Sequence, residues 1–435
     1  MISIIIVVSW HGHHPSYCAQ FIRACASFSE KVFVICPEEA NPIERLGAFA
    51  PVAAKTRVVH FANRYSKSGF RKFRSLIEDF RDLRRLVGSI IRTQPESKVF
   101  IFHSDLNSLF WNVFHLPLLV FCIRGLFPWT FNGLLVTPDR KWPLETVRSR
   151  LKRFFGEADD CRNPLGLLRN TSDGILTIAG DAVRRFYLWQ RNLAIRRSRC
   201  VVIAIEDERY LDCLRTGTGK RTAFLPETTS VEVSDPPPEL VQMIRSKKDA
   251  SMVVGLLGAI SPRKGIDLLV DAIKSCDTAG LLFVIAGPCG RGDIPADQWD
   301  FLMNESHKCR NLIFDPDPIT SEEEFNAIVK ACDILYCAYK GQLHSSNVIS
   351  KAAAFRKPVL VSGGELMAKR VEEYRMGTIL TKWTPAACIS ALRRMSSSQY
   401  LREIQESARF NQYMKDHSFE SLRKVMAALS EQAPE

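Results

Sequence analysis

A turn that follows an apolar run carries the residues best suited to binding phosphate. The run ends at Gly258, and Arg263, Lys264 and Gly265 follow before a helical pattern begins. Such a turn directs backbone N–H groups, a helix N-terminus and a flexible cation toward one point, as a diphosphate requires. An ordinary strand–turn–helix with a solvated lysine is the alternative interpretation.

Two further apolar runs are followed by small or polar residues. One is followed by a segment that contains Ser345, Ser346 and Asn347, and the other by Gly363 and Gly364. Ligands of open α/β sheets bind beyond the carboxyl ends of parallel strands. We therefore expect these segments and the first turn to meet at one crevice.

The first half of the chain offers histidine and aspartate after two predicted strands. His13 lies in a loop after the first strand, and His103 and Asp105 lie at the end of another. Any of the three could place an acceptor hydroxyl or act as a base. A structural loop and a capped helix start are the alternatives, and the histidines of the first loop have no carboxylate partner that would indicate a metal.

Asp315 and Asp317 have the Asp-x-Asp spacing that can hold a metal on a sugar nucleotide. A proline follows each aspartate, which favours a turn. We therefore expect no metal and no other cofactor. Transfer from a sugar nucleotide without a metal needs positive groups that stabilise the departing diphosphate, and Arg263 and Lys264 suit this role.

Short apolar runs alternate with helical patterns along the whole chain, which is typical of parallel sheets covered by helices on both faces. The runs predict strands at 2–8, 31–36, 58–61, 99–103, 134–137, 175–179, 201–205, 223–225, 252–257, 281–286, 312–314, 334–336, 358–361 and 378–380. The pattern predicts an α/β protein with two doubly wound, Rossmann-like units.

Helix signals lie between these runs. Apolar residues from Phe73 to Ile91 have helical spacing, and the opposite face carries Arg71, Lys72, Arg74, Arg81, Arg84 and Arg85. Ser321 and Glu324 form a predicted capping box, and Thr384 with Pro385 predicts another helix start.

Length and charge indicate two domains. A chain of 435 residues is too long for one ordinary core, and the proline-rich segment 226–240 reads as a linker between 1–225 and 241–435. Residues 1–225 hold 34 basic and 20 acidic side chains, whereas the remainder holds 25 and 27. The positive excess of the chain therefore lies in its first half.

Composition excludes several other classes. The chain has 13 cysteines, an odd number with no CxxC pair, which suits reduced core thiols in the cytosol. No secretory signal opens it. The apolar stretch 109–131 contains Arg124 and two prolines, so we expect a buried or surface-dipping segment rather than a membrane span. The basic residues lack interleaved aromatics, and no nucleic-acid partner is expected.

The order of these motifs resembles the glycosyl transferases group 1 family, retaining nucleotide-sugar transferases of the GT-B fold. Its motif positions are matched here by Gly258, Lys264–Gly265, Asp333, Ala352–Ala354, Pro358–Val359 and Gly363–Gly364. The resemblance covers residues 250–380 well and the first half only in outline. It implies two Rossmann-like domains facing a cleft, an acceptor-binding first domain and a donor-binding second domain.

Two positions depart from the family pattern. Ala259 stands where the family has an arginine, and Arg263 could supply that charge instead. Leu343 and Lys351 stand where the family has its Glu-x7-Glu pair, whose second glutamate is expected to bind ribose. These two departures affect what the resemblance implies about donor binding, and they do not affect what it implies about the fold.

The resemblance implies a cytoplasmic, retaining glycosyltransferase of the hexosyltransferase type. Its donor would be bound by Gly258, Arg263, Lys264, Ser345, Ser346, Asn347, Gly363 and Gly364, with His103, Asp105 or His13 at the acceptor. The basic first half favours an anionic or lipid-linked acceptor in polysaccharide biosynthesis and peripheral contact with the inner membrane face. A sugar-nucleotide epimerase and a non-catalytic assembly partner are the alternatives.

Overall fold

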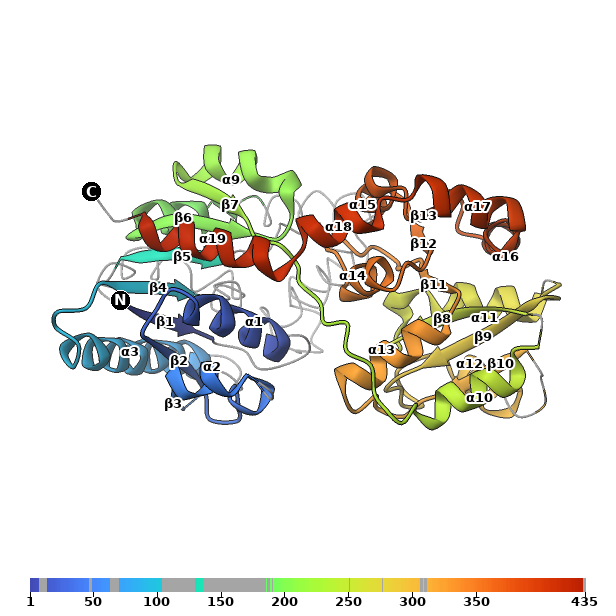
Figure 1. The fold of residues 1–435 in the computed structure, drawn as a ribbon, viewed down its shortest axis with the longest axis horizontal. Helices are drawn as coiled ribbons and strands as arrows, with labels where there is room; N and C mark the ends of the chain where they lie inside the picture. Colours follow the sequence, from blue (N-terminus) through green and yellow to red (C-terminus); the bar gives the residue numbers. More distant parts are fainter. Residues whose placement is uncertain are drawn as a thin grey trace, which may run out of the picture. The chain divides into compact units, whose positions relative to one another are not determined.

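The computed structural model describes residues 1–7, 14–46, 49–62, 70–103, 130–135, 185, 188–189, 191–249, 251–275, 277–305, 308 and 311–432. The chain divides into two compact units, one of residues 1–225 with 423–435 and the other of residues 226–422 (Figure 1). Segment 226–240 thus belongs to the second unit. Residues 423–435, which we assigned to the second domain from the sequence, belong to the first unit.

The first unit is built on a seven-stranded parallel sheet in the order β3-β2-β1-β4-β5-β6-β7 within the described residues. Its strands are β1 (Ile2–Ile6), β2 (Lys31–Pro37), β3 (Thr56–Phe61), β4 (Val99–His103), β5 (Phe131–Leu135), β6 (Cys200–Ile205) and β7 (Arg221–Phe224). Its helices include α1 (His14–Ala26), α2 (Ala50–Lys55), α3 (Phe70–Arg92), α9 (Leu211–Thr218) and the short η1 (Glu44–Leu46) and η2 (Glu208–Tyr210).

Strand β5 begins three residues before the predicted start at Leu134. The start of the strand was missed because the polar residue Asn132 interrupts the apolar run. The side chain is buried, where its Oδ1 accepts from the Ile101 N–H at 3.1 Å and its Nδ2 donates to the Gln432 carbonyl at 3.3 Å. A buried amide with both ends bonded is tolerated in a sheet interior. The strand predicted at 175–179 lies outside the described residues.

Helix α3 shows the predicted two-faced character where its side chains are described. Leu83, Val87 and Ile90 are buried in the core of the first unit. Arg81, Arg84 and Arg85 are exposed on the other face. No helix among the described residues is long and apolar enough to cross a membrane, and the stretch 104–129 lies outside them.

The second unit has a six-stranded parallel sheet in the order β10-β9-β8-β11-β12-β13. Its strands are β8 (Met252–Leu257), β9 (Leu281–Ala286), β10 (Leu312–Asp315), β11 (Ile334–Cys337), β12 (Val359–Ser362) and β13 (Gly377–Leu380). Its helices are α10 (Glu239–Lys247), η3 (Pro262–Lys264), α11 (Ile266–Ser275), α12 (Ala296–Glu305), α13 (Glu322–Ala331), α14 (Asn347–Ala354), α15 (Leu366–Tyr374), α16 (Pro385–Ser396), α17 (Ser398–Ser407) and α18 (Phe410–Asp416).

Two apolar cores cover the two faces of this second sheet. One contains side chains of α13, α14, α15 and α18, and the other contains side chains of α11, α12 and α16. Both units therefore have the parallel, helix-covered architecture that the apolar runs predict, and the α/β class is confirmed. Helix α19 (Phe419–Glu431) starts in the second unit and ends in the first.

The predicted helix starts are present, one of them in modified form. Thr384 caps α16, its Oγ1 accepting from the Ala387 N–H at 3.3 Å with Pro385 in the first turn. Ser321 caps α13 by accepting from the Glu324 N–H at 3.0 Å. The Glu324 carboxylate accepts from the Thr320 N–H at 2.8 Å instead of completing the box at Ser321.

Candidate functional site

The strand order of the second sheet defines where a ligand is expected. From β8 the chain continues to β9 on one side, whereas β11 and β12 lie on the other side. The connections after β8 and β11 therefore diverge at the carboxyl edge between these two strands. Such a switch point is the usual binding crevice of an open parallel sheet.

Two glycines bring the backbone close together at this edge. Gly258 after β8 has φ +80°, and Gly287 after β9 has φ +127°. A Cβ atom on Gly287 would lie 2.8 Å from the carbonyl carbon of Gly258, so no larger residue fits without a shift. The Gly258 N–H donates to the Ala286 carbonyl at 2.9 Å. The two strand ends are thus held in backbone contact.

Lys264 lies in the short helix η3 and is buried, with 7% of its surface exposed. The sequence predicts a flexible cation here, with a solvated lysine as the alternative, and the burial of the side chain agrees with neither description. Its Nζ donates to the Leu257 carbonyl, the last residue of β8. Burial lowers the pKa of Lys264 to about 8. Cys337 opposes this shift in part, and the neighbouring Arg263 lowers the pKa by a smaller amount. The ammonium is therefore held at the strand end without a carboxylate among the contacts that the structure describes.

Arg263 is exposed and lies beside Lys264. Its guanidinium donates to the Gln342 side chain and lies 5.9 Å from the ring centroid of Tyr339. The Lys264 Nζ lies 5.7 Å from the same ring. The Lys340 N–H donates to the Arg263 carbonyl at 2.8 Å, which ties the turn after β8 to the segment after β11. The structure thus brings together the two segments on either side of the switch point.

Gly265 follows directly and has φ +70°. A Cβ at this position would lie 2.3 Å from the Ala338 carbonyl oxygen, and the Tyr336 hydroxyl donates to the Gly265 carbonyl at 3.0 Å. Only glycine allows this approach between β8 and β11.

The segment after β11 places the predicted polar residues at the start of α14. Ser346 is the N-cap, and its Oγ accepts from the Val348 N–H at 3.4 Å, so Asn347 is the first helical residue. The Ser345 Oγ is buried and has no hydrogen-bond partner among the described residues. The hydrogen-bonding capacity of this hydroxyl is therefore unused within the described protein.

The two glycines after β12 lie at the same sheet edge. Gly363 and Gly364 are exposed, and Gly364 has φ +94° with open space around the position of a Cβ. Gly363 lies beside Leu380 of β13, the next strand. The predicted donor residues thus occupy the carboxyl ends of adjacent strands β8, β11 and β12.

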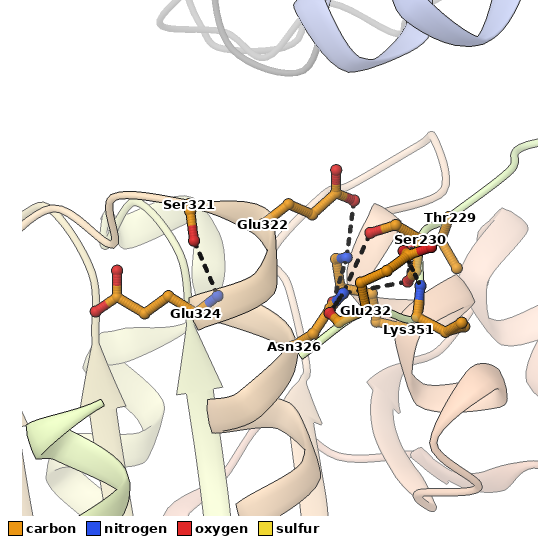
Figure 2. A network of polar contacts seen from close by, with 9 residues as sticks. Thr229, Ser230, Glu232, Ser321, Glu322, Glu324, Asn326 and Lys351 are labelled. Carbon is orange, nitrogen blue, oxygen red and sulfur yellow. Dashed lines mark hydrogen bonds and ion pairs between the residues drawn. The ribbon is translucent and has the colours of Figure 1, made fainter. Parts of the chain in front are cut away.

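Lys351, which stands at the position of the second family glutamate, points away from solvent. Its Nζ donates to Glu322 Oε1 at 2.9 Å and to Asn326 Oδ1 at 2.5 Å (Figure 2). Asn326 in turn donates to the Ser230 and Glu232 carbonyls at 3.3 and 2.7 Å. The residue therefore joins α14 to α13 and to the segment that opens the second unit.

Sequence reasoning missed Tyr339. It follows β11 by two residues, its ring lies beside Arg263 and Lys264, and it is fully buried. Burial raises the pKa of its hydroxyl well above the ordinary value. The sequence indicates a role for Tyr339 in the site only through its position after a strand end, and many core tyrosines share that position.

The acceptor candidates of the first unit are described only in part. His103 is the last residue of β4 and pairs in register with Ile6 of β1, so it lies at the carboxyl edge between β1 and β4. This edge is the switch point of the first sheet. His13 and Asp105 lie outside the described residues.

Asp315 and Asp317 form the predicted turn. The Asp317 N–H donates to Asp315 Oδ1 at 3.2 Å, and the Gly287 N–H donates to the Asp315 carbonyl at 2.9 Å. Across the described part of the chain, no three histidine, cysteine, aspartate or glutamate side chains are grouped as metal ligands would be.

Two doubly wound parallel sheets, each with its polar strand ends at a switch point, define the fold of the GT-B glycosyltransferases. No protein-family model matches the chain, and no curated protein is similar to it in sequence. Sucrose-phosphate synthase from Thermosynechococcus elongatus is similar in structure, with a TM-score of 0.63 at 14% identity over 99% of this chain and 98% of that one. The glycosyltransferase WaaG, involved in lipopolysaccharide biosynthesis, has a TM-score of 0.58 at 14% identity over 100% of both chains. Alr3699/HepE from Anabaena, in complex with UDP, has a TM-score of 0.60 at 14% identity, also over 100% of both chains.

Proposed function

We propose that this protein is a glycosyltransferase that moves a sugar from a nucleotide-sugar donor to an acceptor. The observation that carries the proposal is that Arg263, beside Lys264, is joined through Gln342 to Ser345, just before α14, at the switch point of the second sheet. The glycosyltransferases of the same fold support it, since HepE was solved with UDP and with UDP-glucose.

The site residues divide the work on the diphosphate. Lys264 and Arg263 neutralise the negative charge that develops on the departing diphosphate, and the glycines at the strand ends admit its oxygens close to the backbone. Ser345 and Ser346 donate hydroxyls from the other side of the crevice. These groups stabilise the leaving group without a metal ion. The family resemblance of residues 250–380 supports transfer of a hexose with retention.

The first unit binds the acceptor in this proposal. His103, Asp105 and His13 are the candidates for orienting its hydroxyl or removing the proton. The excess of 34 basic over 20 acidic side chains in residues 1–225 favours an anionic acceptor, such as a lipid-linked phosphate at the inner face of a membrane. Exposed arginines of α3 are part of this charge.

Ligand-dependent melting tests the donor part. Ligands that bind only the native state raise the melting temperature, so we expect one of UDP, GDP or ADP, and its sugar conjugates, to do so. The shift should be the same in EDTA and in magnesium. If none of the three diphosphates changes the melting temperature or binds in calorimetry, the proposal is wrong. A shift that requires a divalent cation would overturn the metal-free mechanism alone.

A further inference from the structure

Glu322, in the first turn of α13, has a carboxylate with two differently placed oxygens. Oε1 accepts from the Lys351 Nζ at 2.9 Å, whereas Oε2 has no hydrogen-bond partner among the described residues. Figure 2 shows this second oxygen pointing away from the network. The side chain is 33% exposed, so the second oxygen is accessible while the first is held.

The group that holds Glu322 is a buried cation with two hydrogen-bond acceptors, Glu322 and Asn326. Lys351 is 2% exposed, and burial lowers its pKa while Glu322 raises it. Asn326 accepts from the ammonium and is itself anchored on the Ser230 and Glu232 carbonyls. Apolar residues of the same volume often stabilise a fold as well as a buried ion pair does, or better. The arrangement does, however, fix the rotamer of the carboxylate.

The carboxylate lies on the side of the candidate site. Phe325, one helical turn after Glu322, has its Cε2 3.6 Å from the position of a Cβ on Gly258. The Lys351 Nζ lies 5.7 Å from the centroid of the same ring. Helix α13 follows β10, so its first turn lies at the carboxyl edge of the sheet. Glu322 is therefore at the same edge as the turn that carries Lys264.

A fixed carboxylate at this edge has a defined chemical use. A carboxylate oxygen accepts hydrogen bonds from hydroxyl groups, and the donor supplies neighbouring hydroxyl pairs on its ribose and on its sugar. The paired ammonium of Lys351 offsets the negative charge that would otherwise repel a nearby diphosphate. We infer that Glu322, held by Lys351, binds a vicinal diol of the nucleotide-sugar donor. This inference rests on the proposed function.

Calorimetry with deoxy ligands tests it. The probes are the nucleoside diphosphate that binds best among UDP, GDP and ADP, its 2′,3′-dideoxy form, and its glucose conjugate. For the native protein we expect affinity for the ribose form to exceed that for the dideoxy form by about ten- to a hundredfold. Glu322→Gln should remove this difference and leave the dideoxy affinity unchanged. Glu323→Gln, an exposed neighbour, is the matched control and should keep it.

Each outcome separates the two proposals. If Glu322→Gln no longer distinguishes the ribose form from the dideoxy form, the diol belongs to the ribose. If Glu322→Gln loses affinity only for the glucose conjugate, the diol belongs to the sugar. Equal affinities of the native protein and Glu322→Gln for all three probes would overturn the inference while leaving the proposed function in place. If no diphosphate binds the native protein, both fall. Lys351→Met should weaken the same discrimination, and circular dichroism shows whether that variant folds.

Discussion

Lys264 is a buried lysine at a strand end, and no carboxylate is among the contacts that the structure describes for it. The free energy of placing the Lys264 ammonium in the protein interior is unfavourable, which is why burial lowers its pKa to about 8. A diphosphate would supply the missing anion and raise that pKa again. If the proposed function holds, the buried ammonium is therefore more stable with the diphosphate bound than without it.

Lys264→Met should separate binding from stability. Loss of a charge-assisted hydrogen bond should weaken diphosphate binding by about ten- to a hundredfold. The free energy of unfolding at pH 7 should stay the same or rise, because the desolvated charge is gone. Calorimetry and urea unfolding measure the two quantities. Unchanged affinity in the folded variant would remove Lys264 from the site.

The same variant provides a pH control. The pKa of Lys264 is about 8 in the folded state and 10.5 in the unfolded state, so the unfolded chain binds the extra proton between these values. The lysine therefore destabilises the fold fully below pH 8, and this penalty disappears as the pH rises toward 10.5. The stability difference between Lys264→Met and the native protein should shrink over that window.

The strands of this fold could be predicted from the sequence, whereas contacts between residues far apart in the sequence could not. Apolar runs predicted the observed strands of the second sheet to within one or two residues at each end, because a buried parallel strand has little room for polar side chains. The burial of Lys264 was missed because its cause is the Leu257 carbonyl and the Tyr339 ring, contacts that only the tertiary structure creates. The pairing of Lys351 with Glu322, 29 residues away in sequence, was missed for the same reason.

The contact between the ends of β8 and β9 gives a second prediction. Gly287→Ala should lower the free energy of unfolding by about 3 kcal/mol, because φ +127° is strained for alanine and the new Cβ would lie 2.8 Å from Gly258. Gly341→Ala is the control, since Gly341 has φ +61° but open space around a Cβ, and it should lose only about 1 kcal/mol. Urea unfolding compares them. Equal losses would mean that the close approach is unimportant.

A buried histidine links α18 to the start of the second unit. The His417 ring stacks on Tyr413 with centroids 4.2 Å apart, and its Nδ1 accepts from the Glu227 N–H at 3.3 Å. Glu227 forms a buried ion pair with Arg370 of α15 at 2.7 Å. Desolvation, with a further contribution from Arg370, lowers the pKa of His417 to about 3 from 6.5. The ring is therefore neutral in the folded protein at any moderate pH.

Acid should destabilise the second unit through this ring. The unfolded chain takes up a proton below pH 6.5 and the folded chain does not, so the contribution of neutral His417 is full above pH 6.5 and is lost as the pH falls toward 3. At pH 5 the loss should be about 2 kcal/mol. His417→Gln should be less stable at pH 7 but lose less between pH 7 and pH 5 in urea unfolding. An unchanged pH slope would contradict this explanation.

At the scale of the whole molecule, charge is distributed unevenly between the two halves of the sequence. We expect the protein to bind vesicles that contain anionic lipid, with binding that falls steeply as salt rises, and not to bind neutral vesicles. Replacing Arg81, Arg84 and Arg85 of α3 with glutamine should weaken the binding, because these exposed side chains are not part of the core. Equal recovery in the supernatant for both lipid types at low salt would refute membrane contact.

The return of residues 423–435 to the first unit affects the order in which the protein can fold during synthesis. Leu429 is buried beside Gly133 of β5, and the Gln432 carbonyl accepts from buried Asn132. The first unit therefore lacks part of its core until the ribosome has added residues more than 280 positions beyond β5. The second unit, residues 226–422, is continuous in sequence and already has all its parts by then. The half of the chain that is synthesised first is consequently the half that is completed last, and it must stay free of aggregation in the meantime.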